Sequence, residues 1–291
     1  MKILFVGVFG IGSTNVSQAE AFERLGHKVI RYDYRQLLKM TFGNVADRDR
    51  NLREEIWNKR PDLTVFSKCN QMDVSCVEAA NKVGVSCLWY MDPKNSNFTE
   101  ELIRKIKAAT FSCFAHLMVV GEALLVSPDS RCYFVPEGYD EKVDFPVDAP
   151  GQIFDVSFIG NTDLRRAELC KLAGALVLFT SFGRQHAEVV SRSKINLNLT
   201  YGDECGPSDR VYKILAAGGF LLTESWVGME ELFKDGQHLV VFRGPADLKA
   251  KVRYYLTHED ERRMIAYAGH LKNEPNSRTT WARRIVEIAE K

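Results

Sequence analysis

The sequence predicts an α/β protein with two Rossmann-like domains, each built around a parallel sheet. Short apolar segments typical of buried strands alternate with amphipathic helical segments, and this alternation restarts after residue 152. Between the halves, Glu141–Gln152 carries Pro146, Pro150 and several acidic residues without apolar periodicity, which is typical of a linker. Two such halves predict a cleft between them. Open α/β sheets bind ligands at the carboxyl ends of their strands, so the expected site lies there.

The expected elements follow from the apolar periodicity of each segment. In the first half we expect strands at Ile3–Val8, Lys28–Tyr34, Leu63–Ser67, Ser86–Met91 and Cys132–Val135. The helices between them are expected at Asn15–Leu25, Arg48–Asn58, Val74–Val83 and Asn97–Ala108. In the second half we expect strands at Phe154–Ile159, Ala175–Phe179, Ile195–Leu199, Phe220–Thr223 and Leu239–Phe242. Its helices are expected at Leu164–Ala173, Asp209–Ala217, Ala246–Leu256, Glu259–Leu271 and Thr279–Lys291.

Composition excludes several classes of protein. The 291 residues carry a formal net charge of +1, so no global field attracts the chain to nucleic acid or to a membrane. The longest apolar runs, such as Ile3–Gly12, fall short of the roughly 20 residues that span a bilayer. Seven cysteines without a CxxC pair, and six histidines without metal spacing, indicate neither a zinc site nor a disulfide framework. Buried reduced thiols are typical of a reducing compartment, and we expect a cytoplasmic location.

A glycine-rich run, G-V-F-G-I-G at residues 7–12, follows the first strand and precedes the first helix. One interpretation is a loop that lets a ligand approach backbone amides at the start of a helix. The other is a tight turn in which Ser13 or Thr14 caps the helix. The dinucleotide fingerprint requires G-x-G-x-x-G, and the order here is different. Because Asp33 ends the second strand, where a ribose-binding acid would stand, an NAD-dependent oxidoreductase remains an alternative.

The most informative segment lies at residues 206–223, where a predicted helix begins next to two cations. Ser208 or Asp209 is the expected N-cap, and we place Arg210 and Lys213 in the first turn. Cations there oppose the helix dipole, so their presence suggests a nearby anion such as a diphosphate. The alternative is that both cations face solvent or form ion pairs with Asp203, Glu204 or Asp209.

A second candidate for anion binding is the first βα turn of the second half, at residues 159–166. Gly160 permits a close approach of the backbone, and Arg165 or Arg166 has the length and charge to reach a phosphate. The alternative interpretation is a capped helix start with arginines on the surface.

These segments, taken together and in order, resemble the CgeB-type group of GT-B glycosyltransferases, which is related to the group 1 glycosyltransferases. The resemblance covers most of the chain and is strongest from Asp155 onward. Its motifs are D-V-S-F-I-G-N at 155–161, the arginine helix and glycine turn at 208–223, E-E-L-F at 230–233, R-Y-Y-L at 253–256 and A-Y-A-G at 266–269. In the first half they are L-G-H-K-V at 25–29, R-P-D-L at 60–63, W-Y-M-D-P at 89–93 and P-E-G-Y-D at 136–140.

The resemblance implies that a sugar is transferred from a UDP-, GDP-, ADP- or TDP-sugar, with retention and without a bound metal or other cofactor. It implies an acceptor-binding domain at 1–144, a donor-binding domain at 145–274, and a last segment, 275–291, that packs back on the first. The expected donor-binding residues are Gly160, Asn161, Arg165, Ser208, Asp209, Arg210, Lys213 and Glu224. The expected acceptor-binding residues are Gly10, Gly12, Ser13, Lys68, Asp92 and Glu137.

The expected chemistry assigns roles to three of these residues. Arg210 and Lys213 would stabilise the leaving phosphate. Asp92 follows an apolar strand and is the candidate base or acceptor-orienting residue, and the alternative is a turn-forming Asp-Pro pair. Related retaining enzymes often have glutamate where Lys213 stands, and that glutamate holds the donor ribose. A charged lysine accepts no hydroxyl hydrogen bonds, so either Lys213 contacts phosphate or another acid, such as Glu224, holds the ribose.

Three further alternatives concern function. The first is the oxidoreductase mentioned above. The second is a non-catalytic protein that binds a sugar nucleotide, which the lysine at position 213 motivates. The third keeps the enzyme but makes its acceptor a modified base in DNA. We expect a monomer or homodimer without a membrane span.

Overall fold

The computed structural model describes residues 1–92, 99–148, 151–179, 181–200 and 206–291. The chain divides into two compact units, residues 1–136 with 278–291 and residues 137–277. The first boundary thus lies at residue 136, where residue 144 was expected. The reason is local, because Tyr139 forms a parallel bridge with Ser277 and its N–H donates to the carbonyl of Asn276. The segment before Pro146 is therefore part of the second unit.

The first unit contains a six-stranded parallel sheet with the order β2-β1-β3-β4-β5-β6. Its strands are β1 Lys2–Gly7, β2 Lys28–Asp33, β3 Leu63–Ser67, β4 Val85–Tyr90, β5 Phe111–Phe114 and β6 Cys132–Phe134. Its helices are α1 Thr14–Arg24, α2 Tyr34–Met40, α3 Val45–Lys59, α4 Ser75–Asn81, α6 Glu100–Ala108, α7 Leu117–Val126 and α14 Arg278–Ala289. Residues 97 and 98 of the helix expected over 97–108 lie outside the described residues.

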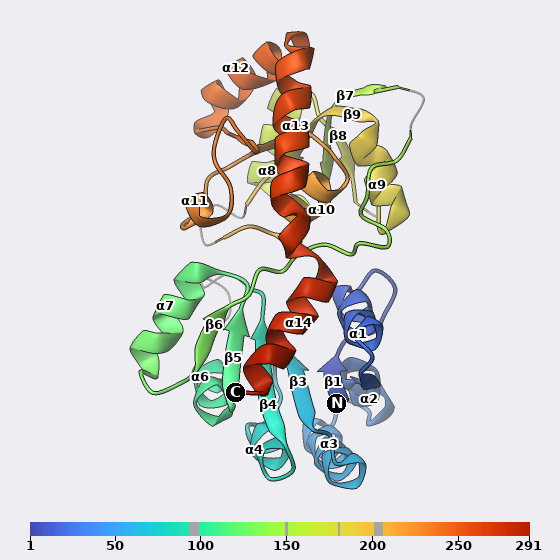
Figure 1. Cartoon of the computed structure of the whole chain (residues 1–291), viewed down its shortest axis with the longest axis vertical. Helices are drawn as coiled ribbons and strands as arrows, with labels where there is room; N and C mark the ends of the chain where they lie inside the picture. Colours follow the sequence, from blue (N-terminus) through green and yellow to red (C-terminus); the bar gives the residue numbers. More distant parts are fainter. Residues whose placement is uncertain (93–98, 149–150, 180, 201–205) are drawn as a thin grey trace. The chain divides into compact units, whose positions relative to one another are not determined.

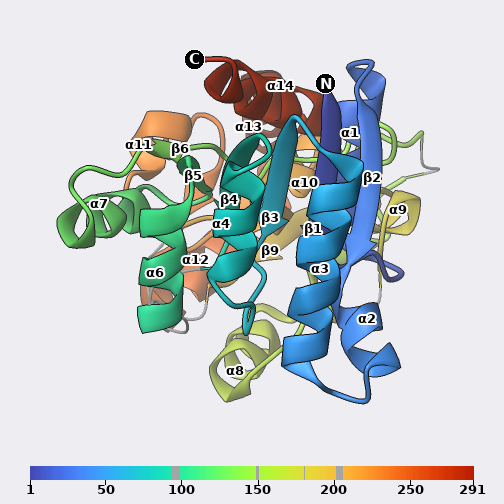
Figure 2. The same cartoon turned by 90° about the horizontal axis from the view of Figure 1, so that it is seen from below.

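Helices cover both faces of this sheet because alternate residues of its strands point to opposite sides. Leu4 and Val6 of β1 pack against a core that includes residues of α3, α4, α6 and α7. Ile3 and Phe5 of the same strand pack against α1 and α14. Figure 2 shows α3, α4 and α6 along one side of the strands.

The C-terminal helix α14 is anchored in the first unit by aromatic packing. Trp281 is 2% exposed, and its ring centroid lies 5.4 Å from that of Phe22 and 5.2 Å from that of Trp89, both edge to face. Each such aromatic pair adds about 0.5–1.5 kcal/mol beyond the area it buries. The last helix therefore completes the core of a domain whose other elements lie more than 140 residues earlier in the chain.

The second unit contains a five-stranded parallel sheet with the order β11-β10-β9-β7-β8. Figure 1 labels β7, β8 and β9 of this sheet. Its strands are β7 Phe154–Ile159, β8 Leu176–Leu178, β9 Ser193–Asn198, β10 Leu221–Thr223 and β11 Val240–Val241. Its helices are α8 Leu164–Ala173, α9 Arg184–Ser191, α10 Asp209–Ala216, α11 Met229–Leu232, α12 Gly244–Thr257, α13 Glu259–Asn273 and the short 3-10 helix Glu274–Asn276. Core residues of α8 and α12 cover one face, and those of α9 and α10 cover the other.

Each sheet has one point at which the direction of strand addition reverses. In the first unit the chain adds β2 on one side of β1 and then β3 on the other. In the second unit it adds β8 on one side of β7 and then β9 on the other. The two loops that leave such a pair of strands diverge to opposite faces, and this opens a crevice at the carboxyl ends. The β1/β3 and β7/β9 ends are therefore where this topology favours a ligand site.

Candidate functional site

Arg210 lies at the switch point of the second sheet. Its Nε donates to the carbonyl oxygen of Ile159 at the end of β7, at 2.6 Å. Its Nη1 donates to Oδ1 of Asn198 at the end of β9, at 2.9 Å. The guanidinium carbon also lies 4.7 Å from the centroid of the buried Phe158 ring. The fold thus places a cation between the two strand ends where an α/β sheet opens its ligand crevice.

Gly160 makes room for this guanidinium. Its φ is +147°, and a Cβ atom at this position would lie 2.3 Å from Nη2 of Arg210. The sequence interpretation gave Gly160 the role of admitting a ligand, and the structure shows that it admits the arginine side chain. Asn161 follows in the same turn, and its carbonyl accepts a hydrogen bond from Arg166 at 3.1 Å.

The two arginines at the start of α8 differ in burial, and Arg165 lines the cavity described below. Arg166 is 3% exposed and donates through Nε to the carbonyl of Thr200 at 3.0 Å, so it holds two loops together. Arg165 has a half-exposed side chain that forms an ion pair with Glu224. Asp163 caps the helix by accepting from the N–H of Arg166 at 2.8 Å. The sequence left the choice between Arg165 and Arg166 open, and the structure assigns the buried position to Arg166.

Glu224 follows β10 and connects to Arg210 through hydrogen bonds, since the hydroxyl of Thr223 donates to the carbonyl of Glu224 at 2.9 Å. Its carboxylate accepts from the N–H of Thr200 at 2.8 Å. The hydroxyl of Thr223, the preceding residue, accepts from Nδ2 of Asn198 at 2.9 Å. Because Asn198 accepts from Arg210, polar contacts run along the carboxyl ends of β7, β9 and β10.

A cavity of about 400 Å³ opens at this same edge of the sheet. Its wall contains the Arg165–Glu224 ion pair, the ends of three strands and the first residue of α12. The lining residues are Arg165, Thr200, Glu224, Ser225, Phe242, Arg243 and Gly244. Its size is that of a small-molecule site. Sequence reasoning missed Asn198, Thr200 and Arg243, although polar residues alternating within the apolar run I-N-L-N-L-T at 195–200 were a visible signal.

Lys213 does not lie in the first turn of its helix, and that expectation was wrong. Helix α10 has eight residues and begins at Asp209, so Lys213 lies in its last turn, where the dipole favours a cation. Its Nζ forms an ion pair with Asp209 at 2.5 Å. The dipole argument for an anion therefore applies to Arg210 alone. Asp203 and Glu204, the other acids considered as partners, lie outside the described residues.

Two polar residues beside α10 add to the site. Ser208 occupies the N-cap position without capping the helix, and its hydroxyl instead donates to Asn198 at 3.0 Å. His186 on α9 is 5% exposed, and burial together with the nearby charge of Lys213 lowers its pKa to about 3. This histidine is therefore neutral at physiological pH and adds no charge to the cluster.

In the first unit, the glycine-rich loop is a capped turn with an exposed tip. Ser13 caps α1 by accepting from the N–H of Asn15 at 3.3 Å, and its hydroxyl donates to the carbonyl of Val8 at 2.5 Å. Gly12 has a φ of +77°, while a Cβ on Gly10 would meet no atom within 4 Å. The positive φ of Gly12 therefore explains why this turn has glycine there, whereas a side chain at position 10 would meet no neighbouring atom.

Asp33, which motivated the NAD alternative, uses its carboxylate to accept hydrogen bonds from backbone N–H groups. Its carboxylate accepts from the N–H groups of Phe9 at 2.8 Å, Arg35 at 3.0 Å and Gln36 at 2.9 Å. It caps α2 and ties that helix to the glycine-rich loop. Because these three backbone amides already use the carboxylate, Asp33 has a structural role.

Lys68 and Asp92 meet at the carboxyl ends of β3 and β4. Their side chains form an ion pair at 2.5 Å, and both are partly exposed. The loop that carries Lys68 is strained, because Lys68, Cys69 and Gln71 all adopt positive φ values, of +63°, +50° and +61°. Non-glycine residues in this region cost about 1–3 kcal/mol each and persist only where the surroundings hold them.

Two buried cations hold this strained loop. Lys105 of α6 is 2% exposed and donates to the carbonyl of Cys69 at 2.6 Å. Arg48 of α3 is fully buried and donates to the carbonyl of Gln71 at 2.6 Å. Neither residue was singled out from the sequence, since a cation on an amphipathic helix is usually exposed.

Glu137, the remaining expected acceptor-binding residue, is the first residue of the second unit and is 7% exposed. Pro93, which follows Asp92, lies outside the described residues. In the part of the chain that the structure describes, no group of three His, Cys, Asp or Glu side chains is arranged to hold a metal ion. No helix among the described residues is long and apolar enough to cross a membrane.

Comparisons with known proteins found one family match and several solved structures with a similar fold. A family described as glycosyl transferase-like matches residues 164–290, the segment that contains Arg210. HepE from Anabaena, solved in complex with UDP and glucose, is 12% identical and matches with a TM-score of 0.73, over 100% of this chain and 99% of that one. A glycosyltransferase from Rickettsia africae is 11% identical, with a TM-score of 0.72 over 99% and 97% of the two chains. No curated protein matches the chain.

A further solved structure with the same fold is a DNA-modifying β-glucosyltransferase. It is 14% identical and has a TM-score of 0.62 over 100% of both chains. The two parallel sheets, and the matches over nearly the full length of both chains, show that this protein has the GT-B fold. The narrower resemblance to the CgeB-type group stays a prediction.

Proposed function

We propose that this protein is a glycosyltransferase that takes its sugar from a nucleotide-sugar and binds that donor at the carboxyl edge of the second sheet. The observation that carries the proposal is Arg210, a guanidinium fixed between the ends of β7 and β9 by Ile159 and Asn198. Of the residues expected to bind the donor, Gly160 and Ser208 lie beside this arginine, and Arg165 and Glu224 line the cavity. Asn161 and Asp209 are their neighbours in the sequence and are proposed with them. HepE, a structural neighbour, was solved with UDP and glucose and with UDP-glucose.

Arg210 and Lys213 would neutralise the diphosphate. Glycosyl transfer places negative charge on the leaving phosphate, and preorganised cations that face this charge lower the barrier. Arg210 needs little reorganisation because its guanidinium is already fixed. Lys213 would exchange its ion pair with Asp209 for the phosphate, since a partly exposed pair contributes only about 0–1 kcal/mol. No bound metal is required for this charge stabilisation.

The cavity of about 400 Å³ is the proposed site of the nucleoside. Glu224 lines it and offers carboxylate oxygens that accept hydrogen bonds from ribose hydroxyls, which the ammonium of Lys213 cannot do. Arg165 would then orient Glu224, as it does in the ion pair seen here. This assignment accounts for the lysine at position 213.

The acceptor is proposed to bind the first unit at the ends of β3 and β4. Asp92 would orient or deprotonate the acceptor hydroxyl, and Lys68 would hold the Asp92 side chain in position through their ion pair. The strained loop supports this assignment, because strain of this kind clusters at functional sites. Gly10, Gly12, Ser13 and Glu137 remain proposed contacts of the acceptor.

Nucleotide affinity tests the donor site. We expect one of UDP, GDP, ADP or TDP to stabilise the protein in a thermal shift panel. In Arg210→Gln the affinity for that nucleotide should fall at least about tenfold, since hydrogen bonds to charged groups contribute about 1.5–3 kcal/mol. Arg253→Gln, which changes an exposed arginine on α12, is the matched control and should bind normally. Equal affinity in wild type and Arg210→Gln would remove Arg210 from the site.

Product analysis tests the chemistry. Nucleotide-sugars incubated with the protein should release free nucleotide, detected by mass spectrometry, and Asp92→Asn should lower transfer to an acceptor more than donor binding. The acceptor panel should contain saccharides and duplex DNA with a hydroxylated base, since one structural neighbour modifies DNA. Retention would appear in the NMR coupling of the anomeric proton of the product. An inverted product would refute the proposed retention.

A further inference from the structure

A second cavity lies at the opposite edge of the second sheet. It has a volume of about 310 Å³, room for about ten water molecules. Lys194, at the start of β9, and Phe220, just before β10, both line it, so it opens at the amino ends of the strands. Lys194 lies four residues before Asn198, which is about 13 Å along a strand. The cavity is therefore separate from the proposed donor site.

One end of this cavity carries a buried cation, Arg262, whose hydrogen-bond acceptors are both neutral. Arg262 of α13 is 3% exposed, and burial lowers the pKa of its guanidinium. Its Nη1 donates to the carbonyl of Tyr255, and its Nη2 donates to Oε1 of Gln152 at 3.4 Å. Both acceptors are neutral, and among the described residues no carboxylate forms an ion pair with Arg262. The charges of Glu259 and Asp155 act on Arg262 without a direct ion pair, so the guanidinium can still donate hydrogen bonds to an anion in the cavity.

Two further cations at the same end, Arg263 and Lys194, form ion pairs that a ligand anion could replace. Arg263 forms an ion pair with Glu259 at 2.6 Å, and Lys194 forms one with Asp155 at 2.6 Å. Exposed pairs like these contribute about 0–1 kcal/mol, so either cation can turn toward a ligand at little cost. The lining residues of the cavity include no carboxylate, whereas Glu259 lines the adjoining groove.

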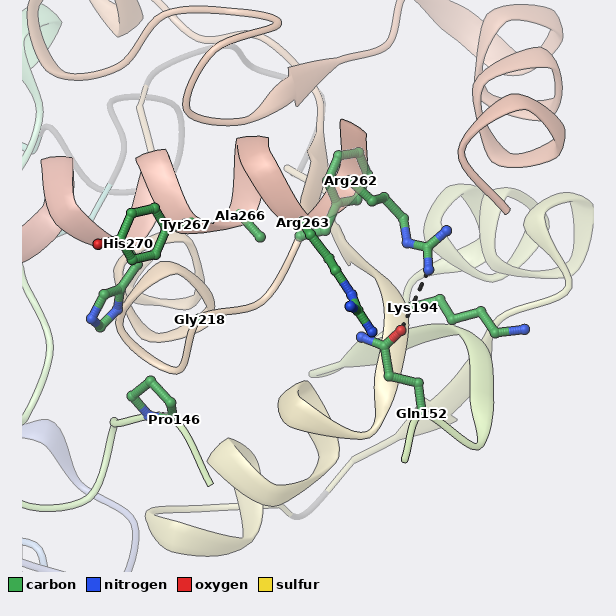
Figure 3. Close-up of a pocket in the computed structure, with 10 residues that line it drawn as sticks. Pro146, Gln152, Lys194, Gly218, Arg262, Arg263, Ala266, Tyr267 and His270 are labelled. Carbon is green, nitrogen blue, oxygen red and sulfur yellow. Dashed lines mark hydrogen bonds between the residues drawn. The ribbon is translucent and has the colours of Figure 1, made fainter. Parts of the chain in front are cut away.

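The other end of the cavity is apolar and aromatic (Figure 3). Tyr267 projects from the same helix as Arg263, one turn along, and the residue is 65% exposed. Pro146 and Gly218 lie across from it. His270 lies 3.1 Å through Nδ1 from the carbonyl of Leu215, so Nδ1 carries the hydrogen and Nε2 remains for a ligand. An aromatic face next to three cations fits a molecule with a flat ring and an anionic head.

We propose that this cavity binds a small organic anion, with its ring against Tyr267 and its carboxylate or phosphate group at Arg262, Arg263 and Lys194. The planar fork of Arg262 suits either head group, because carboxylate and phosphate both present paired oxygens. The site does not depend on the proposed donor site, since the two share no residue.

A ligand-detected NMR titration tests this site with phenyl phosphate, benzoate and inorganic phosphate as probes. We expect phenyl phosphate or benzoate to bind with a Kd of about 1 mM or tighter, as befits a ligand of about ten heavy atoms. Lys194→Gln/Arg263→Gln removes two exposed cations and should weaken binding at least about tenfold without unfolding the protein. Tyr267→Ala should weaken phenyl phosphate about fivefold and leave inorganic phosphate unchanged.

Arg210→Gln is the control that separates this site from the donor site. Binding should persist in Arg210→Gln and be lost in the double variant. The reverse pattern would locate the anion at the donor edge and overturn the proposal. It would also be overturned if no probe bound at about 10 mM, or if inorganic phosphate bound as tightly as phenyl phosphate, because the ring would then have no role.

Discussion

Replacing Gly160 with alanine should displace the guanidinium of Arg210 and so weaken nucleotide binding. The new Cβ atom would lie 2.3 Å from Nη2 and 3.2 Å from Cζ of Arg210, closer than atoms in contact can approach. Arg210 also rests on the Phe158 ring and on the carbonyl of Ile159, so it cannot move without losing these contacts.

Gly160→Ala should have two separate effects, a loss of stability and a loss of nucleotide affinity. Alanine at a φ of +147° is strained by about 1–3 kcal/mol, which lowers the free energy of unfolding. Displacing Arg210 removes charge-assisted hydrogen bonds to the donor phosphate, each contributing about 1.5–3 kcal/mol. Since 1.4 kcal/mol corresponds to a factor of ten, Gly160→Ala should weaken nucleotide affinity by about 10- to 100-fold.

Urea unfolding and calorimetric titration of the nucleotide measure the two effects separately. Gly174→Ala is the matched control, because Gly174 also has a positive φ, +64°, but its Cβ would meet no atom within 4 Å. It should lose stability and keep nucleotide affinity. In an Arg210→Ala background, Gly160→Ala should cost about 1–2 kcal/mol less stability than in wild type, because the clash is gone. Additive stability costs would refute the steric reasoning, and normal affinity in Gly160→Ala would refute the role of Arg210.

Three further predictions concern the structure around the sites. Lys105→Met leaves the carbonyl of Cys69 without its donor, and we expect urea unfolding to show a loss of about 1–3 kcal/mol. Trp281→Ala empties the space between α14 and the first sheet, and should cost about 3–5 kcal/mol in the same assay. Between pH 6.5 and 3 the unfolded chain protonates His186 while the folded chain does not, so stability falls as the pH is lowered. From pH 7 to 5, wild type should lose about 2 kcal/mol more than His186→Leu; an equal loss would contradict the assigned pKa.

The alternation of apolar strands and amphipathic helices was enough to predict both parallel sheets. All ten expected strands are present, and their bounds differ from the expected ones by at most two residues. The sequence analysis missed β5, Phe111–Phe114, because four residues give too short a pattern to be distinguished from a buried loop. It missed α7, Leu117–Val126, because that helix is apolar on nearly all sides and shows no helical period.

The candidate site was predicted less completely, because its geometry depends on contacts between distant residues. Arg210 was found from its place at a helix start, whereas its partners Ile159 and Asn198 come from two other strands. The position of Lys213 was misjudged because a turn is 3.6 residues long, and the fifth residue of an eight-residue helix lies nearer to its end. An error of two residues in a helix boundary therefore changes whether the helix dipole is expected to favour or to oppose a cation at a given position.

Polar residues in buried strand ends were the signal that the sequence analysis underused. A buried amide also lies beside β1/β3, where Asn15 in the first turn of α1 accepts from the N–H of Val8 and donates to the hydroxyl of Ser67. At β7/β9, Asn198 accepts from Arg210 and donates to the next strand through Thr223. A buried amide costs free energy unless all its hydrogen bonds are made, so one in an apolar strand indicates that a loop is fastened there. In both sheets the loops held by these amides are those at the switch point. A ligand that binds there would not have to order a mobile loop, which would cost binding free energy.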